Sequence, residues 1–533
     1  MTDMLDKIKH FIKSCEELPM SLGLWLATAL SIIYLRDSLE CIVSVGVFPV
    51  ADLFHLLHVP IFFISLLLAI ILILHFFSKE EITKVSKISL IFFTVILLPV
   101  TIDFIISRFV KREIVYQYIM ENMGIDFIHF FNPFFRIPEI PYSLRIEIAI
   151  VTLWSFLYIF LKRNKIFLSL LGAFIVFCLC FFHIAIPNFL INGFIFLMKN
   201  LIFLFRSFFL QLLGGSLKGM VDERIVVTTE LLFTLFLLIV WYWRYDANKS
   251  RALFRNLRIT RLLHYSALVL MGTVLFFYDT PERDLFVLIK IGGMLCALFF
   301  AFQFSVIIND IFDVGCDSLS NKDRPLITGV FRKEDYLKVG WVYLALALLF
   351  AIWVSDFCFI ITVVFLALYF IYSAPPLQLK RFYPVNVIII GLQALLAFLL
   401  GQVSLAPDQA PLPFYPSVSW LIFIIFVLGS HIKDLKDSEG DRSCNVMTLL
   451  TMLGEKKARH VTAGLVLLSY LLTPFIFSPL FSNTFIFLFA LLFGVANYFY
   501  IRRKDSQENV IFGTYLIYGA ILFFFLVKSV FFS

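Results

Sequence analysis

Two clusters of aspartates carry the chemistry that this sequence can perform. Each cluster holds three carboxylates at the spacing i, i+3 and i+7, and each follows a long apolar segment. The first cluster comprises Asp310, Asp313 and Asp317, and the second comprises Asp434, Asp437 and Asp441. On a helix, residues at this spacing share one face. One such spacing is common by chance, and two solvated acidic loops are the alternative. Two copies in a chain this apolar favour a functional pair.

Carboxylates at the end of a membrane segment need a positive partner. Three of them on one face repel one another, and each costs roughly 2.5–3.5 kcal/mol if it lies unpaired at bilayer depth. Divalent cations that prefer oxygen ligands, above all Mg²⁺, are the natural counter-ions. We therefore expect each cluster to hold one Mg²⁺ ion, giving two ions in the site.

The composition identifies the kind of protein that positions these clusters. Of 533 residues, 61% are apolar and 15% are charged, whereas charged residues reach about 25% in soluble domains. Many segments are long and apolar enough to cross a membrane as helices. The net charge of +7 does not indicate nucleic-acid binding, because the basic residues lie in short loops between the segments. The sequence predicts an all-α, polytopic membrane protein surrounded by membrane lipids.

The apolar segments fall into two groups that are separated by the polar linker 244–250. We predict a domain of about six spans over residues 1–249 and a nine-span domain over residues 250–533. The six earlier apolar runs lie near residues 21–35, 53–77, 88–106, 146–162, 166–185 and 224–243. The nine later runs lie near residues 263–278, 285–308, 336–354, 357–373, 384–404, 416–432, 460–477, 482–500 and 510–531.

Basic residues predict the orientation of the second group. From Arg244 onward, 22 of the 25 Lys and Arg residues lie in the linker and in alternate loops. Such loops face the cytoplasm, so both aspartate clusters are expected to open to that side. The first 19 residues are charged and lack the short apolar core of a signal peptide. The eight cysteines form no CxxC pair and lie mostly in apolar segments, which predicts neither disulfides nor a zinc site.

The aspartates belong to four sequence blocks that occur in a fixed order. They read NDxxDxxxD from Asn309, NKxRPLxxG from Asn321, YSxPPxxLKR from Tyr372 and KDxxDxEGDR from Lys433. In these blocks, the chain from about residue 250 to residue 533 resembles the UbiA superfamily of intramembrane prenyltransferases. Residues 1–249 lie outside this resemblance. They are only faintly similar to Yip-type membrane domains, and we find no chemistry-bearing motif in them.

The resemblance implies Mg²⁺-dependent transfer of a prenyl group from an isoprenoid diphosphate to a hydrophobic acceptor. Asp310, Asp313, Asp434 and Asp437 would then be catalytic, and all six aspartates would bind metal. The diphosphate would be bound by Asn309, Arg324, Tyr372 and Lys380. Metals would neutralise the charge that develops as the C–O bond breaks, and exclusion of water would protect the allylic cation.

The sequence leaves alternatives open for the acceptor and for the class of function. An aromatic acceptor of quinone biosynthesis is the first expectation, and a glycerol-phosphate ether-lipid acceptor is the second. A membrane transporter or scaffold would instead place buried carboxylates in mid-span.

Two features depart from the family pattern. Lys436 lies between cluster aspartates, and Gly315 beside Cys316 predicts that Asp317 lies on a loop. His431 is a candidate for positioning an acceptor or for a structural role. Whether residues 1–249 bind a partner is an open question.

Overall fold

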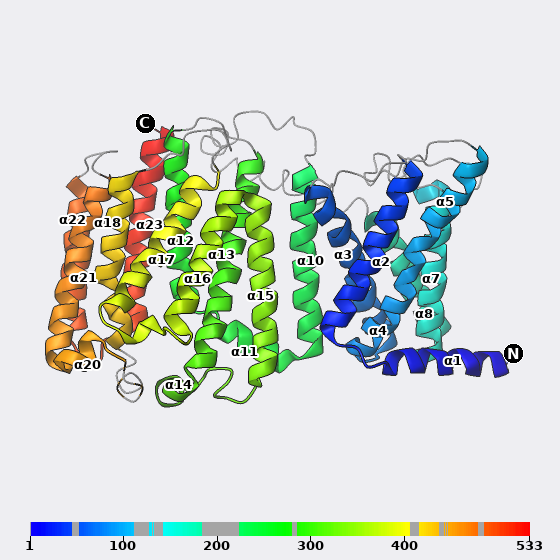
Figure 1. Ribbon diagram of the computed structural model, residues 1–533, viewed down its shortest axis with the longest axis horizontal. Helices are drawn as coiled ribbons and strands as arrows, with labels where there is room; N and C mark the ends of the chain where they lie inside the picture. Colours follow the sequence, from blue (N-terminus) through cyan, green and yellow to red (C-terminus); the bar gives the residue numbers. More distant parts are fainter. Residues whose placement is uncertain are drawn as a thin grey trace. The chain divides into compact units, whose positions relative to one another are not determined.

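The structure is helical throughout the part of the chain that it describes. This computed structural model describes residues 2–44, 53–110, 127–130, 132, 142–183, 223–279, 285–405, 415–435, 442, 444, 446–477 and 484–532. Within these ranges no β-strand occurs, and 14 helical segments are long and apolar enough to cross a membrane (Figure 1). The prediction of an all-α, multi-pass membrane protein is confirmed.

The chain divides into two compact units. The first contains Met1–Phe205 and Lys218–Ala247, and the second contains Arg206–Leu217 and Asn248–Ser533. Along the chain, the final change of unit therefore falls inside the polar linker 244–250. Six of the candidate spans in the described residues belong to the first unit and eight belong to the second.

Helix α3 lies at the centre of the first unit. It packs against α2, α4, α7, α8 and α10, and its side chains Phe62, Ile71 and Leu74 are buried with Tyr158 of α7 and Phe181 of α8. The described elements of this unit are α1 (Thr2–Glu17), α2 (Leu22–Ser44), α3 (Leu53–Ser78), α4 (Ile82–Phe92), η1 (Phe93–Ile96), α5 (Leu97–Val110), α7 (Tyr142–Arg163), α8 (Ile166–His183) and α10 (Glu223–Tyr245).

Nine long helices occupy the nine predicted apolar positions in the described part of the second unit. They are α12 (Ile259–Asp279), α13 (Leu285–Phe312), α15 (Lys333–Val354), α16 (Asp356–Ser373), α17 (Val385–Val403), α18 (Pro416–Gly429), α21 (Glu455–Phe477), α22 (Thr484–Ile501) and α23 (Glu508–Phe532). The shorter elements are α11 (Ala247–Arg255), α14 (Val314–Ser320), η2 (Leu379–Arg381), η3 (Ser430–Leu435) and α20 (Leu449–Leu453).

Two glycines bring α12 and α17 into direct backbone contact. A Cβ atom at Gly272 would lie 2.2 Å from the carbonyl oxygen of Phe398, and one at Gly401 would lie 1.9 Å from that of Val269. Both positions therefore exclude any larger residue. Close approach of this kind is a common way to pack helices in a membrane, where dispersion contacts replace the hydrophobic effect.

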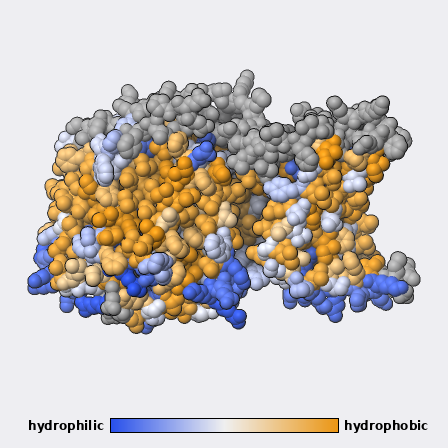
Figure 2. Space-filling model, in the orientation of Figure 1, coloured by the Kyte–Doolittle hydropathy of each residue, from blue (hydrophilic) through white to orange (hydrophobic). Residues whose placement is uncertain are grey.

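The short elements of the second unit gather at one end of its long helices. Helices α11, α14 and α20 all lie at this end (Figure 1). On the visible face of this unit, apolar side chains cover the middle of the helices, and hydrophilic side chains collect at the end that carries these short elements (Figure 2). The described residues of both aspartate clusters belong to this polar end, because Asp313 directly follows α13 and Asp434 lies in η3.

Candidate active site

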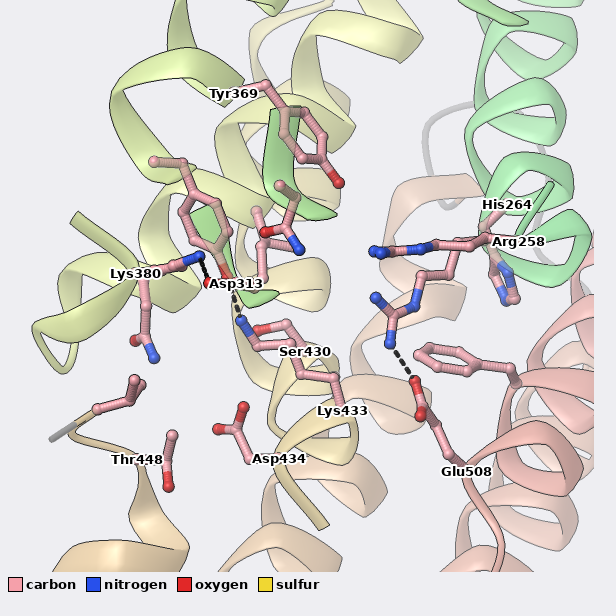
Figure 3. A pocket seen from close by; sticks show the side chains of 18 of the residues that line it. Arg258, His264, Asp313, Tyr369, Lys380, Ser430, Lys433, Asp434, Thr448 and Glu508 are labelled. Carbon is pink, nitrogen blue, oxygen red and sulfur yellow. Dashed lines mark hydrogen bonds and ion pairs between the residues drawn. The ribbon is translucent and has the colours of Figure 1, made fainter. Parts of the chain in front are cut away.

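The polar end of the second unit contains a cavity of about 260 Å³ that collects most of the predicted site residues (Figure 3). Seven of the ten predicted residues line it: Asn309, Asp313, Asp317, Arg324, Tyr372, Lys380 and Asp434. Asp310 is buried and does not line it. The predicted ligands Asp437 and Asp441 lie outside the described residues. Residues from segments more than 100 positions apart therefore meet around one space.

The first aspartate cluster is divided between two helices. Helix α13 ends at Phe312, and Asp313 is the residue that precedes α14. Asp317 lies on α14, so the expectation that Gly315 and Cys316 would put it on a loop is wrong. The break falls at Asp313 instead, a residue type that often precedes a helix. Because the Asp313 carboxylate does not cap α14, it is available to the cavity.

Lys380 supplies a cation to Asp313. The ammonium group of Lys380, which lies in η2, donates a hydrogen bond to Asp313 Oδ1 and forms an ion pair with it (Figure 3). Both side chains are largely buried. The segment after the Pro375–Pro376 turn therefore places a positive charge directly beside the first cluster, where the sequence predicts a diphosphate-binding lysine.

Asp310 holds cationic and polar groups in place behind the cavity wall. Its carboxylate accepts hydrogen bonds from Arg258 Nη2 at 2.6 Å, Asn256 Nδ2 at 2.7 Å and the Tyr336 hydroxyl at 3.0 Å. Asp310 is only 1% exposed. Arg258, by contrast, lines the cavity. The contacts of Asp310 therefore orient an arginine that faces the cavity.

Asp317 carries an oxygen that is suited to a cation. Its Oδ1 accepts a hydrogen bond from Asn321 at 2.9 Å, whereas its buried Oδ2 accepts none from the described residues. The guanidinium Nε of Arg324 lies 3.9 Å from Oδ2. Burial raises the pKa of Asp317 to about 6, although the charge of Arg324 opposes this rise. Burial also lowers the pKa of Arg324.

Another part of the cavity wall is formed by η3 and the end of α16. Lys433 donates a hydrogen bond to the Tyr372 hydroxyl at 2.7 Å, and Asp434 beside it is buried and lines the cavity. His431 does not line the cavity. Its ring lies 3.1 Å from the carbonyl oxygen of Leu428 and 3.5 Å from the Tyr383 hydroxyl, which supports its structural alternative.

Several cavity residues were missed by the sequence analysis. Arg258 and Arg261 belong to a basic run that also serves as an orientation signal, and Lys433 directly precedes Asp434. Arg261 pairs with Glu508 of α23 at 2.6 Å. The spacing of Arg258 and Arg261, at i and i+3 before an apolar segment, could have indicated that both face the bundle. The apolar part of the wall is aromatic and aliphatic and includes Tyr265, Tyr369, Ile390, Ile425, Phe426, Phe512 and Tyr515.

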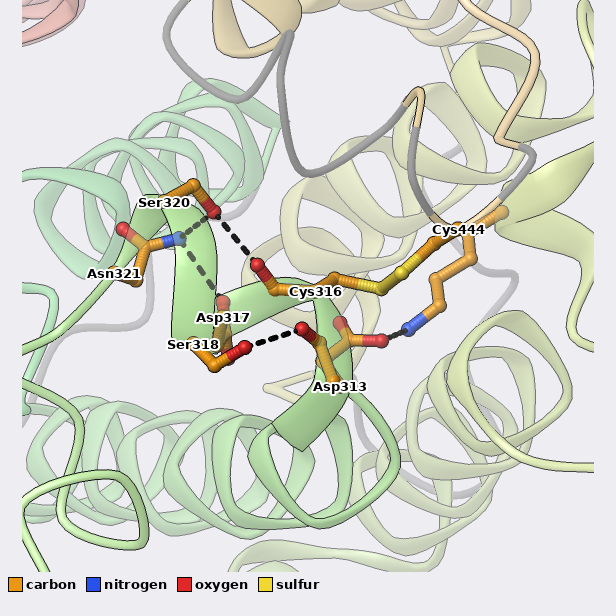
Figure 4. Close-up of a disulfide and its surroundings, with 9 residues drawn as sticks. Asp313, Cys316, Asp317, Ser318, Ser320, Asn321 and Cys444 are labelled. Carbon is orange, nitrogen blue, oxygen red and sulfur yellow. Dashed lines mark hydrogen bonds and ion pairs between the residues drawn. A yellow bond between two sulfur atoms is a disulfide. The ribbon is translucent and has the colours of Figure 1, made fainter.

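A disulfide joins the two acidic segments (Figure 4). Cys316 of the first cluster is bonded to Cys444, and their Cα atoms are 6.0 Å apart. The prediction that no disulfide forms is therefore wrong. Its reason was the missing short-range cysteine spacing, but these two residues are 128 positions apart, and the pairing of such cysteines cannot be read from spacing.

The oxygen donors around the cavity fit a hard divalent cation that a bound substrate helps to coordinate. Within the described ranges, no three His, Cys, Asp or Glu side chains lie close enough together to hold a metal ion by themselves. Mg²⁺ usually binds through one or two carboxylates, waters and phosphate oxygens of a substrate. Asp317 Oδ2, with Asp313 and Asp434 around the same cavity, supplies oxygen donors of that type.

The fold and the site define an integral membrane protein whose helical bundle carries an acidic and basic pocket with an aromatic wall at its polar end. Residues 266–525 match the UbiA prenyltransferase family. This half of the chain is a UbiA-family domain, as the four sequence blocks predicted.

Several named proteins and solved structures are similar to this half of the chain. The chain is 26% identical over 178 residues to a digeranylgeranylglyceryl phosphate synthase of Methanocaldococcus jannaschii, covering 33% of this chain and 60% of that protein. It is 32% identical to a homogentisate solanesyltransferase of Arabidopsis thaliana, covering 34% and 49%. A UbiA homologue from Archaeoglobus fulgidus, solved with GPP and Mg²⁺, aligns with a TM-score of 0.42 and 21% identity over 53% of this chain and all of that one.

Proposed function

We propose that the second unit catalyses the Mg²⁺-dependent transfer of a prenyl group from an isoprenoid diphosphate to a hydrophobic acceptor. One observation carries this proposal: carboxylates of both acidic clusters line the same cavity as Lys380, Lys433 and an aromatic wall. A prenyl diphosphate combines a charged head with an apolar tail, and this cavity offers a counterpart to each. The carboxylates lie at helix ends, which favours this function over an ion pathway through mid-span carboxylates.

The acidic residues are the metal-binding part of the proposed site. Asp313, Asp317 and Asp434 would hold Mg²⁺, together with the predicted ligands Asp437 and Asp441. The bound ions would neutralise the negative charge that develops on the departing diphosphate. The prediction that two ions bind stays part of this proposal, as does direct metal contact by Asp310.

The basic residues of the chain bind and orient the diphosphate. Lys380 is a compact point charge that suits a phosphate oxygen. On metal binding to Asp313, its ammonium group is free to turn from the carboxylate to the diphosphate. Arg258, fixed by Asp310, presents a second cation to the same space. Asn309 and Tyr372 add an amide and a hydroxyl, and both already have polar partners in Ser373 and Lys433.

The apolar wall protects the reaction. The side chains around Tyr369, Phe426 and Phe512 exclude water, which would otherwise capture the allylic cation. The faces of aromatic rings also stabilise a nearby cation. The acceptor attacks the prenyl carbon as the diphosphate leaves, and its proton passes to solvent or to a nearby base.

Two acceptor classes have support. Aromatic acceptors are supported by a relative that is named a homogentisate solanesyltransferase. A glycerol-phosphate ether-lipid acceptor is supported by two relatives that are named digeranylgeranylglyceryl phosphate synthases. We retain the aromatic acceptor as the first candidate, because the relatives of that class reach 32% identity and the ether-lipid synthases 26–27%. In either case, the positive-inside rule supports a site that opens to the cytoplasm.

Turnover by the purified protein tests the proposal. The full chain, in detergent with Mg²⁺, is incubated with labelled geranyl or geranylgeranyl diphosphate and one acceptor of each class. We expect release of inorganic diphosphate and a prenylated product that mass spectrometry identifies. A folded protein that binds prenyl diphosphate but transfers it to neither acceptor class would contradict the proposed reaction.

A further inference from the structure

The Cys316–Cys444 disulfide stands at the junction of the two acidic segments. Cys316 lies between Asp313 and Asp317 and lines the cavity. Cys444 follows the second cluster by three positions. The six other cysteines all lie within described helices, and none of them is disulfide-bonded. The bridge therefore links the two candidate metal-binding segments directly, rather than joining elements elsewhere in the bundle.

The disulfide completes a ring of contacts around the cavity. Asp313 pairs with Lys380. The carbonyl oxygen of the next residue, Arg381, accepts a hydrogen bond from the backbone amide of Met447 at 3.0 Å. Met447 lies three positions after Cys444, whose bond to Cys316 leads back to the segment of Asp313. We call this closed set of contacts the rim.

The disulfide is the covalent member of the rim. Among the described residues, the other rim contact of the segment after the second cluster is the backbone hydrogen bond from Met447 to Arg381. A single hydrogen bond is much weaker than a covalent bond. Val446 and Thr448 of this segment also line the cavity, so its position affects the shape of the site. The covalent bond thus fixes this segment to the first acidic cluster.

From this arrangement we propose that Cys316 and Cys444 form a reversible redox modification site that controls the binding of the metal–diphosphate group. The inference rests on the proposed function. Asp313, Asp317 and Asp434 would hold the metal ions of that group, and a ligand that contacts several segments binds more tightly when they are already held in place. In the oxidised state the disulfide links the segment of Val446 and Thr448 to Cys316, and in the reduced state this link is lost.

The chemistry of the switch is thiol–disulfide exchange. One thiolate of a dithiol reductant attacks a sulfur of the bridge and forms a mixed disulfide, and its second thiolate then releases the bound cysteine. Two electrons pass from the reductant to the protein. Cys316 and Cys444 each gain a proton, and the reductant leaves as a cyclic disulfide. A small-molecule disulfide carries out the reverse reaction.

The bridge itself is tested first. The full-length protein is purified without reductant, its free thiols are alkylated in denaturant, and its peptides are analysed by mass spectrometry before and after treatment with dithiothreitol. We expect Cys316 and Cys444 to be alkylated only after reduction. Complete alkylation of both residues in protein exposed to an oxidised dithiol would show that the bridge does not form and would overturn the inference.

Binding is then compared between the two redox states. Inorganic diphosphate with Mn²⁺ is the probe, and calorimetry or electron paramagnetic resonance of bound Mn²⁺ gives its affinity without turnover. We expect about tenfold weaker binding after reduction, and the same loss in a Cys316→Ser/Cys444→Ser protein without any reductant. Cys296→Ser, which changes an unbonded cysteine of α13, is the matched control and should bind like the unchanged oxidised protein.

The outcomes separate this inference from the proposed function. Equal binding in both redox states, or tighter binding in the reduced state, would overturn the switch but leave diphosphate binding intact. Absence of binding in both states would contradict the proposed function and the switch together. A loss in the double-serine protein that is also seen in Cys296→Ser would indicate a general effect of cysteine removal and would overturn the switch.

Discussion

Both units hold a cavity with charged residues, but the charges are arranged differently. In the first unit, a cavity of about 80 Å³ has mostly apolar walls, with Arg36 and Glu147 among its lining residues. Arg36 there pairs with Glu40 at 2.6 Å. In the second unit, a cavity of about 260 Å³ is lined by Asp313, Asp317 and Asp434 and by cations from several helices.

The two units differ in the partners of their charged groups. A buried ion pair such as Lys162 with Glu16, at 2.7 Å in the first unit, satisfies its own members. The charges of the second unit surround a cavity, and their partners, such as Lys380 for Asp313, are groups of the kinds that can bind phosphate or metal. Buried charge by itself therefore does not identify a site. Charges of both signs that converge on one cavity do, and the following predictions test that distinction.

The largest expected effect is on stability, at Asp310. Asp310→Ala leaves the buried guanidinium of Arg258 without its strongest partner, and breaking such a pair typically costs about 3–5 kcal/mol. Denaturation of the purified variants measures this loss. Asp335→Ala removes a more exposed partner of Lys249 and Lys338 and should cost under about 1 kcal/mol. Equal stability of the two variants would contradict the role of Asp310 as a structural anchor.

The next effect is on turnover, at Asp313 and Asp434. Replacing either by alanine should lower prenyl transfer at least about a hundredfold, the effect of losing one preorganised electrostatic group. Labelled prenyl diphosphate gives the rate, and circular dichroism checks folding. Glu147→Gln, in the cavity of the first unit, should leave the rate unchanged. If both aspartate variants kept near-normal turnover, the cavity of the second unit would not be the catalytic site.

A smaller effect is expected at Lys380. Lys380→Met removes a charge-assisted contact to the diphosphate and should weaken substrate binding by about tenfold or more. The loss should be similar for geranyl and geranylgeranyl diphosphates, because the lysine acts on the head group. Lys333→Met, which changes a basic residue outside the cavity, is the control. A loss that varied strongly with chain length would place Lys380 near the tail or the acceptor instead.

The smallest effect is expected from removing the first unit. A chain that starts at Asn248 keeps all four sequence blocks and every described residue that lines the larger cavity. It should retain prenyl transfer close to that of the full chain. A truncated protein that is folded in detergent but inactive, beside an active full chain, would show that the first unit contributes to the site.

The positions of the long helices could be predicted from the sequence, because they depend only on the length and hydropathy of the apolar segments. The motif blocks also identified Asp313, Asp317, Lys380 and Asp434 as neighbours, since the resemblance relates segments that are distant in sequence. Spacing could not separate the roles of Asp310 and Asp313, because both lie within three residues of the break between α13 and α14. Only the structure shows that the chain turns at Asp313, which puts Asp310 behind the wall.

Other features of the site had no signal in the sequence that points to a cavity. Arg258 and Lys433 are basic residues beside membrane segments, where charge also sets orientation, so their type did not indicate a cavity. The Cys316–Cys444 bond joins α14 to a residue 128 positions away, and the two meet only after the bundle forms. These residues are defined by tertiary contacts, which neither periodicity nor local spacing reports.

The central claim is that a diphosphate binds between the two acidic clusters in the cavity of the second unit. The most direct test is an experimental structure of the full chain with Mn²⁺ and a non-reacting thio-analogue of geranyl diphosphate, with anomalous scattering locating the metal. We predict Mn²⁺ beside Asp313, Asp317 and Asp434, with the diphosphate in contact with Lys380 and the prenyl tail along the aromatic wall. Metal and diphosphate bound elsewhere, with these carboxylates unoccupied, would contradict the account.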